Sequence, residues 1–427
     1  MLDRSSGVDE GRSGRARLRF FASGLGRYLL LPALLIAGPL LASMAVGVDT
    51  HNLLYDFKGG LYNAGVAILH GNSPYRGVFL AHQAAIMRAG HIALGETTRH
   101  PFSVPVYPAA ANVAILPLSA LPLWPAASIY TLGSIAAMLG GIWLLGVRDW
   151  RCFALVSLSW PFLYGMYLGA INPFLVLGAG VAWRWRDRLW PPALGLATII
   201  ALKIFPWTLG AWLLFTRRWR ALALTVVACG VVTFGAWAAI GFHGLAQYPQ
   251  MLSNVSYLQE GRADSVVTAL VVAGVGPSFA SVVAIVLALG VLGLAWRAAR
   301  RPDGDRRAFG LVVIAALTGT PIVWEHYMVL VFIPIAMLSP RVSRLWLVPV
   351  VLPIVELMSR IVLPDSSRLQ AYSPNALRGA LPWLCVEVAL TTLLCTTVEQ
   401  RAAARAWLRG RLAPRRSRPA SAMRPAR

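Results

Sequence analysis

One short polar segment holds the residue types that proton transfer and anion binding require. Asp56 and Lys58 lie two positions apart in it, and Tyr62 and Tyr75 follow downstream. A carboxylate can accept a proton, and a nearby cation can hold an anionic group of a substrate. A helix cap or a solvated charge at the membrane interface is the alternative role for Asp56.

Other polar residues interrupt apolar runs farther along the chain. They are Tyr107, Asn172, Lys203 and the segment Glu325-His326-Tyr327. An ionisable side chain inside a membrane segment costs about 2.5–3.5 kcal/mol, so Lys203 needs a reason to be there. It could bind a phosphate or carboxylate in a cavity, or snorkel to the interface. Asn172 precedes Pro173 and fits a turn, and His326 fits an interfacial histidine as well as a functional one.

Neither a metal nor a cofactor is expected. The loop histidines lack the close spacing of a metal site, and the four cysteines lie inside apolar runs as small buried residues. Glu356 and Arg360 are four apart and fit a structural ion pair. The sequence has no phosphate loop, dinucleotide glycine run or nucleophile elbow.

An amphipathic helix is predicted around Asp56. Its apolar positions recur at three- and four-residue steps and share one face, namely Leu54, Phe57, Leu61, Gly65 and Ile68. Asn52 could cap this helix, and Gly71 could end it with Pro74 close behind. Such a helix beside a spanning segment is expected in the membrane interface, which would hold Asp56 near headgroup level.

The composition identifies the class of protein. Of the 427 residues, 57% are hydrophobic and only 13% charged, against about 25% charged in soluble domains. The net charge of +22 is concentrated in arginine clusters between alternate apolar runs and at both ends of the chain. That is the positive-inside pattern of a multi-pass membrane protein and excludes a nucleic-acid-binding role.

The same rule predicts the topology of an all-α polytopic protein. Residues 1–27 and 401–427 form basic cytoplasmic ends, and residues 28–400 form the transmembrane domain with about twelve spans. Residues 49–121 form a long first extracytoplasmic loop, in which the path of 105–121 is left open. The apolar pieces 190–202 and 206–216, which flank Lys203, are too short to span alone and indicate a cavity.

Several motifs, in this order along the chain, resemble those of the family-87 glycosyltransferases, which are GT-C membrane enzymes. The matching segments are Asp56-Phe57, Tyr62-Asn63-Ala64-Gly65, Leu69-His70-Gly71-Asn72-Ser73-Pro74-Tyr75, Tyr107-Pro108 with Leu116-Pro117-Leu118, Gly169-Ala170-Ile171-Asn172, Lys203-Ile204-Phe205-Pro206 and Pro321-Ile322-Val323-Trp324-Glu325-His326-Tyr327. The resemblance spans roughly residues 50–340. In three places the chain departs from the family pattern. Tyr107-Pro108 lacks the second proline, Ala170 replaces the usual glutamine, and Gly319-Thr320 precedes Pro321.

The resemblance implies a GT-C fold and a sugar transfer on the extracytoplasmic side of the cell (inner) membrane. The donor would be a polyprenyl-phosphate sugar, with mannose expected, and the acceptor a hydroxyl of a glycolipid or glycan. It carries the role of general base onto Asp56 and places His326 near the reaction centre. Substrate-binding roles are expected for Lys58, Tyr62, Tyr75, Tyr107, Asn172, Lys203, Glu325 and Tyr327.

Two other classes of function stay open at this point. Broken helices with a buried lysine also occur in secondary transporters, including a flippase for lipid-linked sugars. The chain shows no clear repeat of its first half in its second, which favours the enzyme. A non-catalytic subunit of a glycan-assembly complex is the other alternative, and Asp56 argues against it.

Overall fold

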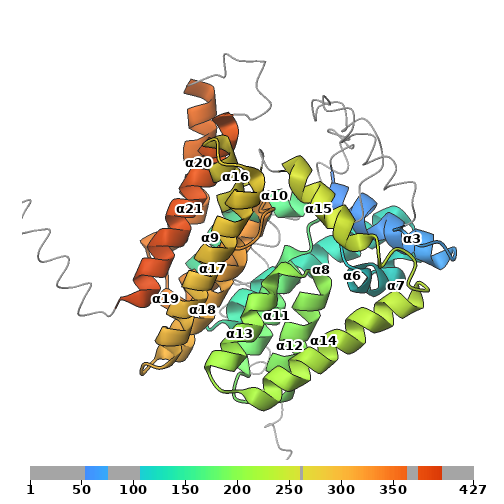
Figure 1. The fold of residues 1–427 in the computed structure, drawn as a ribbon, viewed down its shortest axis with the longest axis horizontal. Helices are drawn as coiled ribbons and strands as arrows, with labels where there is room; N and C mark the ends of the chain where they lie inside the picture. The colour runs from blue at the N-terminus through green and yellow to red at the C-terminus, as the bar shows by residue number, and fades with distance from the viewer. Residues whose placement is uncertain (1–52, 76–105, 260–262, 363–373, 397–427) are drawn as a thin grey trace, which may run out of the picture.

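The computed structural model describes residues 53–75, 106–259, 263–362 and 374–396, and within these ranges it is all-helical (Figure 1). The predicted basic ends, 1–27 and 401–427, and the predicted cap Asn52 lie outside these ranges. Glu356 and Arg360 fall in the part of a helix, from residue 354 onward, whose side chains the structure does not describe. Their ion pair therefore stays a prediction.

The first half of the chain forms short helices followed by longer ones. They are η1 (Asp56–Tyr62), α3 (Asn63–Leu69), α6 (Ala109–Ala114), α7 (Leu116–Ser119), α8 (Leu123–Leu144), α9 (Trp150–Leu158), α10 (Trp160–Leu168), α11 (Asn172–Arg184), α12 (Trp190–Leu202), η2 (Phe205–Trp207) and α13 (Thr208–Phe215). The segment 105–121, whose path the sequence left open, contains α6 and α7.

The second half continues with helices that pack against this set. They are α14 (Trp219–Ala239), α15 (Tyr248–Gln259), α16 (Val266–Val272), α17 (Pro277–Ala299), α18 (Gly304–Thr318), η3 (Glu325–Val331), α19 (Phe332–Leu338), α20 (Arg344–Val362) and α21 (Pro374–Cys395). Helix α17 packs along α18, and α8 along α11. In Figure 1, α20 and α21 lie on the opposite side of the molecule from α3, α6 and α7.

Three helices in the described ranges are long and apolar enough to cross a membrane. They are α8, α14 and α17, and they agree with predicted spans. Helices α10 and α11 meet at a bend of 120° and could together form a fourth span or a re-entrant loop. The count of about twelve spans stays a prediction, because only these helices, and the bent pair, meet the criteria of length and apolar content within the described residues.

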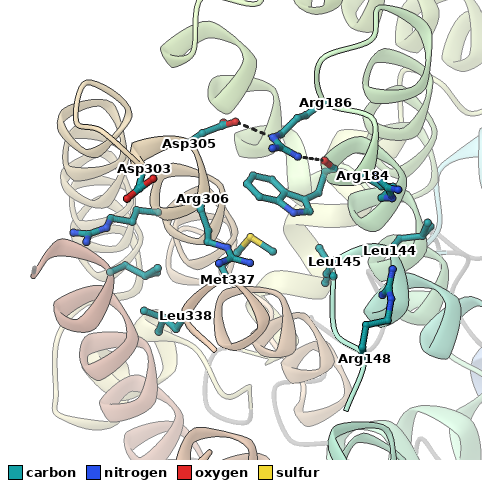
Figure 2. Close-up of a pocket in the computed structure, with 14 residues that line it drawn as sticks. Leu144, Leu145, Arg148, Arg184, Arg186, Asp303, Asp305, Arg306, Met337 and Leu338 are labelled. Atoms are coloured by element: carbon teal, nitrogen blue, oxygen red, sulfur yellow. Dashed lines mark hydrogen bonds and ion pairs between the residues drawn. The ribbon is translucent and has the colours of Figure 1, made fainter. Parts of the chain in front are cut away.

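The basic turns between helices gather at one end of the molecule. Arg218 donates to Asp305 at 2.9 Å and to Asp187 at 3.2 Å, and Arg186 lies 3.2 Å from Asp305. These contacts join the turns after α11, after α13 and before α18, and Figure 2 shows part of this end. The clustering agrees with the positive-inside pattern, which puts such turns on one side of the membrane.

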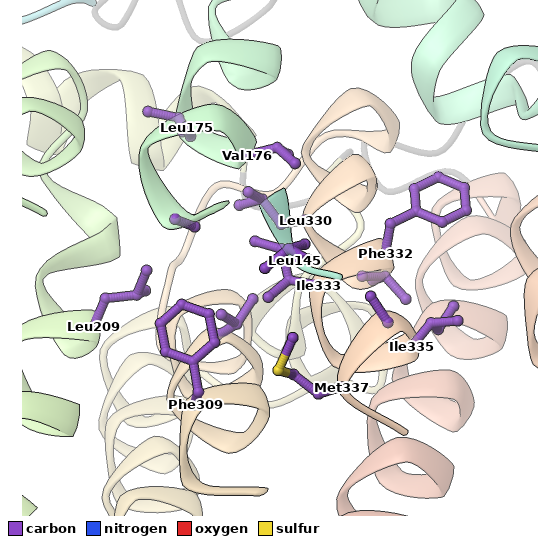
Figure 3. Packing of buried hydrophobic residues seen from close by; sticks show 14 of the residues in the cluster. Leu145, Leu175, Val176, Leu209, Phe309, Leu330, Phe332, Ile333, Ile335 and Met337 are labelled. Carbon is purple, nitrogen blue, oxygen red and sulfur yellow. The ribbon is translucent and has the colours of Figure 1, made fainter. Parts of the chain in front are cut away.

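A large apolar core fills the middle of the bundle. Phe309 of α18 packs on Trp183 and Trp212, with ring centroids 5.2 and 4.7 Å apart. Figure 3 shows buried side chains of α11, α13, α18 and α19 in this core. Helices α11 and α12 each contain 13 residues, so the two ends of each helix lie roughly 20 Å apart. Asn172 and Lys203 lie at the ends away from the basic turns.

Candidate active site

The helix that carries Asp56 is fixed to the bend between α10 and α11. The backbone N–H of Leu54 donates to the carbonyl of Tyr167 at 2.6 Å, and Phe57 is fully buried. Gly169 in the bend has a φ of +70°, and a Cβ atom there would lie 2.6 Å from the Cβ of Phe57. A glycine is therefore required where the two segments meet.

The predicted amphipathic face is confirmed, with one difference in backbone geometry. Leu54, Phe57, Leu61 and Gly65 are buried, and Gly71 follows the helix with a φ of +73°. The segment begins as a π-helix rather than an α-helix: the N–H of Asn63 bonds to the carbonyl of Lys58, five residues back. Single π-turns of this kind occur frequently at functional sites.

Asp56 lies between a tyrosine and a histidine that come from distant parts of the chain. The hydroxyl of Tyr107 donates to Asp56 Oδ2 at 3.3 Å, and His326 Nε2 lies 3.8 Å from the same oxygen. The carboxylate side chain is 18% exposed, so it remains accessible. Burial raises the pKa of Asp56 to about 6. The charge of Lys203 and the hydrogen bond from Tyr107 act in the opposite direction and lower this pKa.

Asn172 connects the other two elements of the site. Its amide nitrogen donates to the backbone carbonyl of His326 at 2.9 Å. Its amide oxygen accepts from the ammonium of Lys203 at 3.0 Å. The residue expected to be a turn residue is thus also a buried bridge between the end of α12 and η3.

The ammonium of Lys203 sits among aromatic rings. It lies 3.5 Å from the ring centroid of Tyr327, 5.7 Å from that of Tyr107 and 5.8 Å from that of Phe205. The helix breaks here because Lys203 is extended, with φ −155° and ψ 120°, and Pro206 follows. An ammonium has three N–H donors, and Asn172 takes one of them, which leaves donors for an anionic ligand.

The structure thus brings together six of the predicted site residues: Asp56, Tyr107, Asn172, Lys203, His326 and Tyr327. The other four predicted residues are Tyr75, Tyr62, Glu325 and Lys58. Tyr75 donates to the carbonyl of Tyr107 at 2.6 Å and so supports it. Tyr62 donates to the carbonyl of Leu121 at 2.7 Å. Glu325 accepts a hydrogen bond from the indole of Trp160, and Lys58 is partly buried.

Three aromatic residues that were not predicted as site residues lie near His326, although one of them, Trp324, belongs to the motif matched above. Trp324 stacks on its imidazole at 5.7 Å between ring centroids, and Tyr164 lies 6.0 Å from it. Trp160 stacks in turn on Tyr164 at 5.5 Å. The four-residue step from Trp160 to Tyr164, which places both on one helix face, was the signal for them. Both ring nitrogens of His326 are buried without a hydrogen-bond partner among the described residues.

The arrangement supplies a carboxylate, a buried cation and an aromatic wall at one place. A partly exposed carboxylate whose pKa lies near neutrality suits proton acceptance. A buried ammonium with free donors suits a phosphate. Within the described ranges, no group of three or more histidine, cysteine, aspartate or glutamate side chains could hold a metal ion.

Comparison with known proteins yields one family and one curated relative. The relative is a polyprenol-phosphate-mannose-dependent alpha-(1-2)-phosphatidylinositol pentamannoside mannosyltransferase from Mycolicibacterium smegmatis (strain ATCC 700084 / mc(2)155). It is 27% identical over 251 residues, which are 52% of this chain and 58% of the relative, so the match spans less than two thirds of that protein. No solved structure matches the chain.

The family match covers the middle of the site. The model of glycosyltransferase family 87 matches residues 106–323, about half of the chain. That range contains Tyr107, Asn172 and Lys203, whereas Asp56 lies well before its start and His326 just after its end. The chain belongs to glycosyltransferase family 87.

Proposed function

We propose that this chain is a membrane glycosyltransferase that takes a sugar from a polyprenyl-phosphate donor. The family membership supports the class of enzyme, and the name of the relative supports the donor and mannose as the sugar. The acceptor is a hydroxyl of a glycolipid or glycan. The site faces the periplasm or exterior, because the basic turns lie at the far end of α11 and α12 and the positive-inside rule assigns that end to the cytoplasm.

The observation that carries the proposal is the accessible carboxylate of Asp56 beside a buried ammonium. Asp56 accepts the proton of the acceptor hydroxyl as its oxygen attacks the anomeric carbon. The new carbon–oxygen bond forms while the bond from that carbon to the phosphate oxygen breaks, and the electron pair leaves with the polyprenyl phosphate. A single displacement of this kind inverts the anomeric configuration.

The leaving polyprenyl phosphate gains a negative charge, and Lys203 is placed to bind it. The free N–H donors of this ammonium supply charge-assisted hydrogen bonds inside a water-poor site, where they are strongest. Asn172 and the ring of Tyr327 hold the ammonium in position. His326 lies against Asp56 and stabilises the charge that changes there.

The aromatic residues and the first-loop helix shape access to the site. Trp160, Tyr164 and Trp324 provide flat apolar surfaces beside His326, of the kind on which a sugar ring packs. The lipid tail of the donor would lie between helices at the membrane interface, next to the amphipathic helix η1–α3. Tyr75, through Tyr107, holds the hydroxyl that contacts Asp56.

The test is sugar transfer by the purified chain in proteoliposomes. Radiolabelled polyprenyl-phosphate mannose is supplied with a membrane lipid extract, next to a panel of other polyprenyl-phosphate sugars and protein-free vesicles. We expect label in a new glycolipid of inverted anomeric configuration, only with protein. Label that crosses the bilayer on an unchanged donor, with no transfer from any sugar in the panel, would identify a transporter instead.

A further inference from the structure

A cavity lies at the opposite end of the bundle from Asp56. It has a volume of about 680 Å³ and is lined by residues from the turns after α8 and α11, the start of α18 and the end of α19. Figure 2 shows it, with Arg148 and Arg184 on one side and Asp303 and Arg306 on the other. Nothing in the proposed transfer reaction uses it.

The cavity wall carries an excess of positive charge. Five arginines line it: Arg148, Arg184, Arg186, Arg306 and Arg307. The acids that line it are Asp303 and Asp305. Asp305 is already shared by Arg186 at 3.2 Å and Arg218 at 2.9 Å, and it also accepts from the indole of Trp212. It therefore does not neutralise the other arginines.

Two of these arginines have neither an ion pair nor a hydrogen bond within the part of the chain that the structure describes. They are Arg184 and Arg306. Burial and the charge of Arg184 lower the pKa of Arg148. Burial and the charge of Arg186 lower the pKa of Arg306, and the charge of Asp303 offsets part of this effect. Like charges gathered in one hollow repel one another, and an anion held between them would relieve this repulsion.

The rest of the wall is apolar, which distinguishes the cavity from a simple phosphate site. Leu144, Leu145, Met337 and Leu338 contribute aliphatic side chains next to the arginines. Leu144 and Leu145, which line the cavity, lie at the end of α8, a helix long and apolar enough to cross a membrane. Basic pockets between spanning helices on the cytoplasmic side bind anionic lipid headgroups. The wall thus suits a ligand with a phosphate at one end and an apolar body at the other.

We propose that this cavity binds the phosphate-bearing headgroup of an anionic phospholipid of the cytoplasmic leaflet. The guanidinium groups of Arg184 and Arg306 bind the phosphate oxygens. The aliphatic side chains contact the glycerol and the first part of the acyl chains. The bound lipid links the turns after α8 and α11 to the start of α18 and steadies the bundle roughly 20 Å from the transfer site.

The experiment titrates short-chain phosphatidylglycerol into the purified full chain in detergent and follows tryptophan fluorescence, because Trp183 lines the cavity. Parallel titrations use phosphatidylcholine of the same chain length and inorganic phosphate. The cavity variant is Arg184→Gln/Arg306→Gln. Its matched control is Arg217→Gln/Arg220→Gln, which removes two exposed charges outside the cavity wall.

We expect phosphatidylglycerol to bind the wild type and the control equally and to bind the cavity variant roughly 30-fold more weakly. Phosphatidylcholine should bind none of them. Equal affinity in the cavity variant would overturn the site, and inorganic phosphate binding as tightly as the lipid would overturn the lipid assignment. If the double variant does not fold, Arg184→Gln alone is used, with a smaller loss expected. The readout is lipid binding, so the result is independent of whether the chain transfers sugar.

Discussion

The proposed base makes the pH dependence of transfer a direct reporter of the site. Burial raises the pKa of Asp56 to about 6, and the charged, active form is the one that has lost its proton. Transfer should therefore fall as the pH decreases through this value. At pH 6 half of the carboxyl groups are ionised, and at pH 5 about a tenth are, so kcat/KM should drop about fivefold between pH 6 and pH 5 and about tenfold per pH unit below that.

Lys203→Met tests whether the cation acts on this carboxyl. The charge of Lys203 lowers the pKa of Asp56, so its removal should move the acidic limb of the profile to higher pH. At pH values above this limb, the substitution should also reduce kcat by about 10²–10³, which is the ordinary cost of losing one stabiliser of developing negative charge. Arg220→Met removes an exposed charge at the other end of the bundle and is the matched control.

The assay is initial-rate transfer from the labelled donor in proteoliposomes between pH 4.5 and 8.5, roughly two units either side of the expected limb. Thermal stability is measured at each pH, to separate loss of activity from unfolding. A wild-type rate that stays undiminished down to about pH 5, as expected for a carboxyl with its ordinary pKa near 4, would refute the effect of burial. A limb that stays in place in Lys203→Met would refute the coupling between the two residues.

Three further variants test how the site is held. Tyr107→Phe should move the acidic limb to higher pH, but by less than Lys203→Met does, because the hydrogen bond from Tyr107 has the smaller effect on the pKa of Asp56. The pH profile of transfer measures this shift. Gly169→Ala should cost about 1–3 kcal/mol of stability through its positive φ and its close contact with the first-loop helix, seen as a lower Tm. Gly210→Ala, which has open space around it and lies in helix α13, should not lower Tm. Asn172→Leu should lower both Tm and kcat, because it leaves a buried ammonium and a backbone carbonyl unpaired at a cost of about 1–3 kcal/mol. An unchanged kcat in that variant would show that the bridge has no part in transfer.

The apolar periodicity around Asp56 predicted which side chains are buried, because burial of one helix face depends on local spacing. It did not predict the π-turn at the start of that helix, which accompanies the docking of Leu54 on Tyr167. Hydropathy predicted α8, α14 and α17, whose length and apolar content are properties of the local sequence.

Residues with long-range partners were harder to interpret. Asn172 fits a turn from its spacing, and its bridging role depends on η3, 154 residues later in the chain. Tyr62 and Glu325 were expected in the site because their motifs resemble those of the family, yet Tyr62 bonds to Leu121 and Glu325 to Trp160. Such contacts are set by how the helices pack, which the spacing within one segment does not specify.

The central claim is that Asp56 removes the proton from the acceptor, and Asp56→Asn tests it most directly. Single-turnover transfer and donor binding are measured on the same preparation, with Asp187→Asn, an exposed acid at the basic end, as the matched control. We expect transfer by Asp56→Asn to fall about 10²–10⁴-fold while donor binding and Tm stay at wild-type values. Transfer at the wild-type rate by this variant would contradict the account and remove Asp56 as the base.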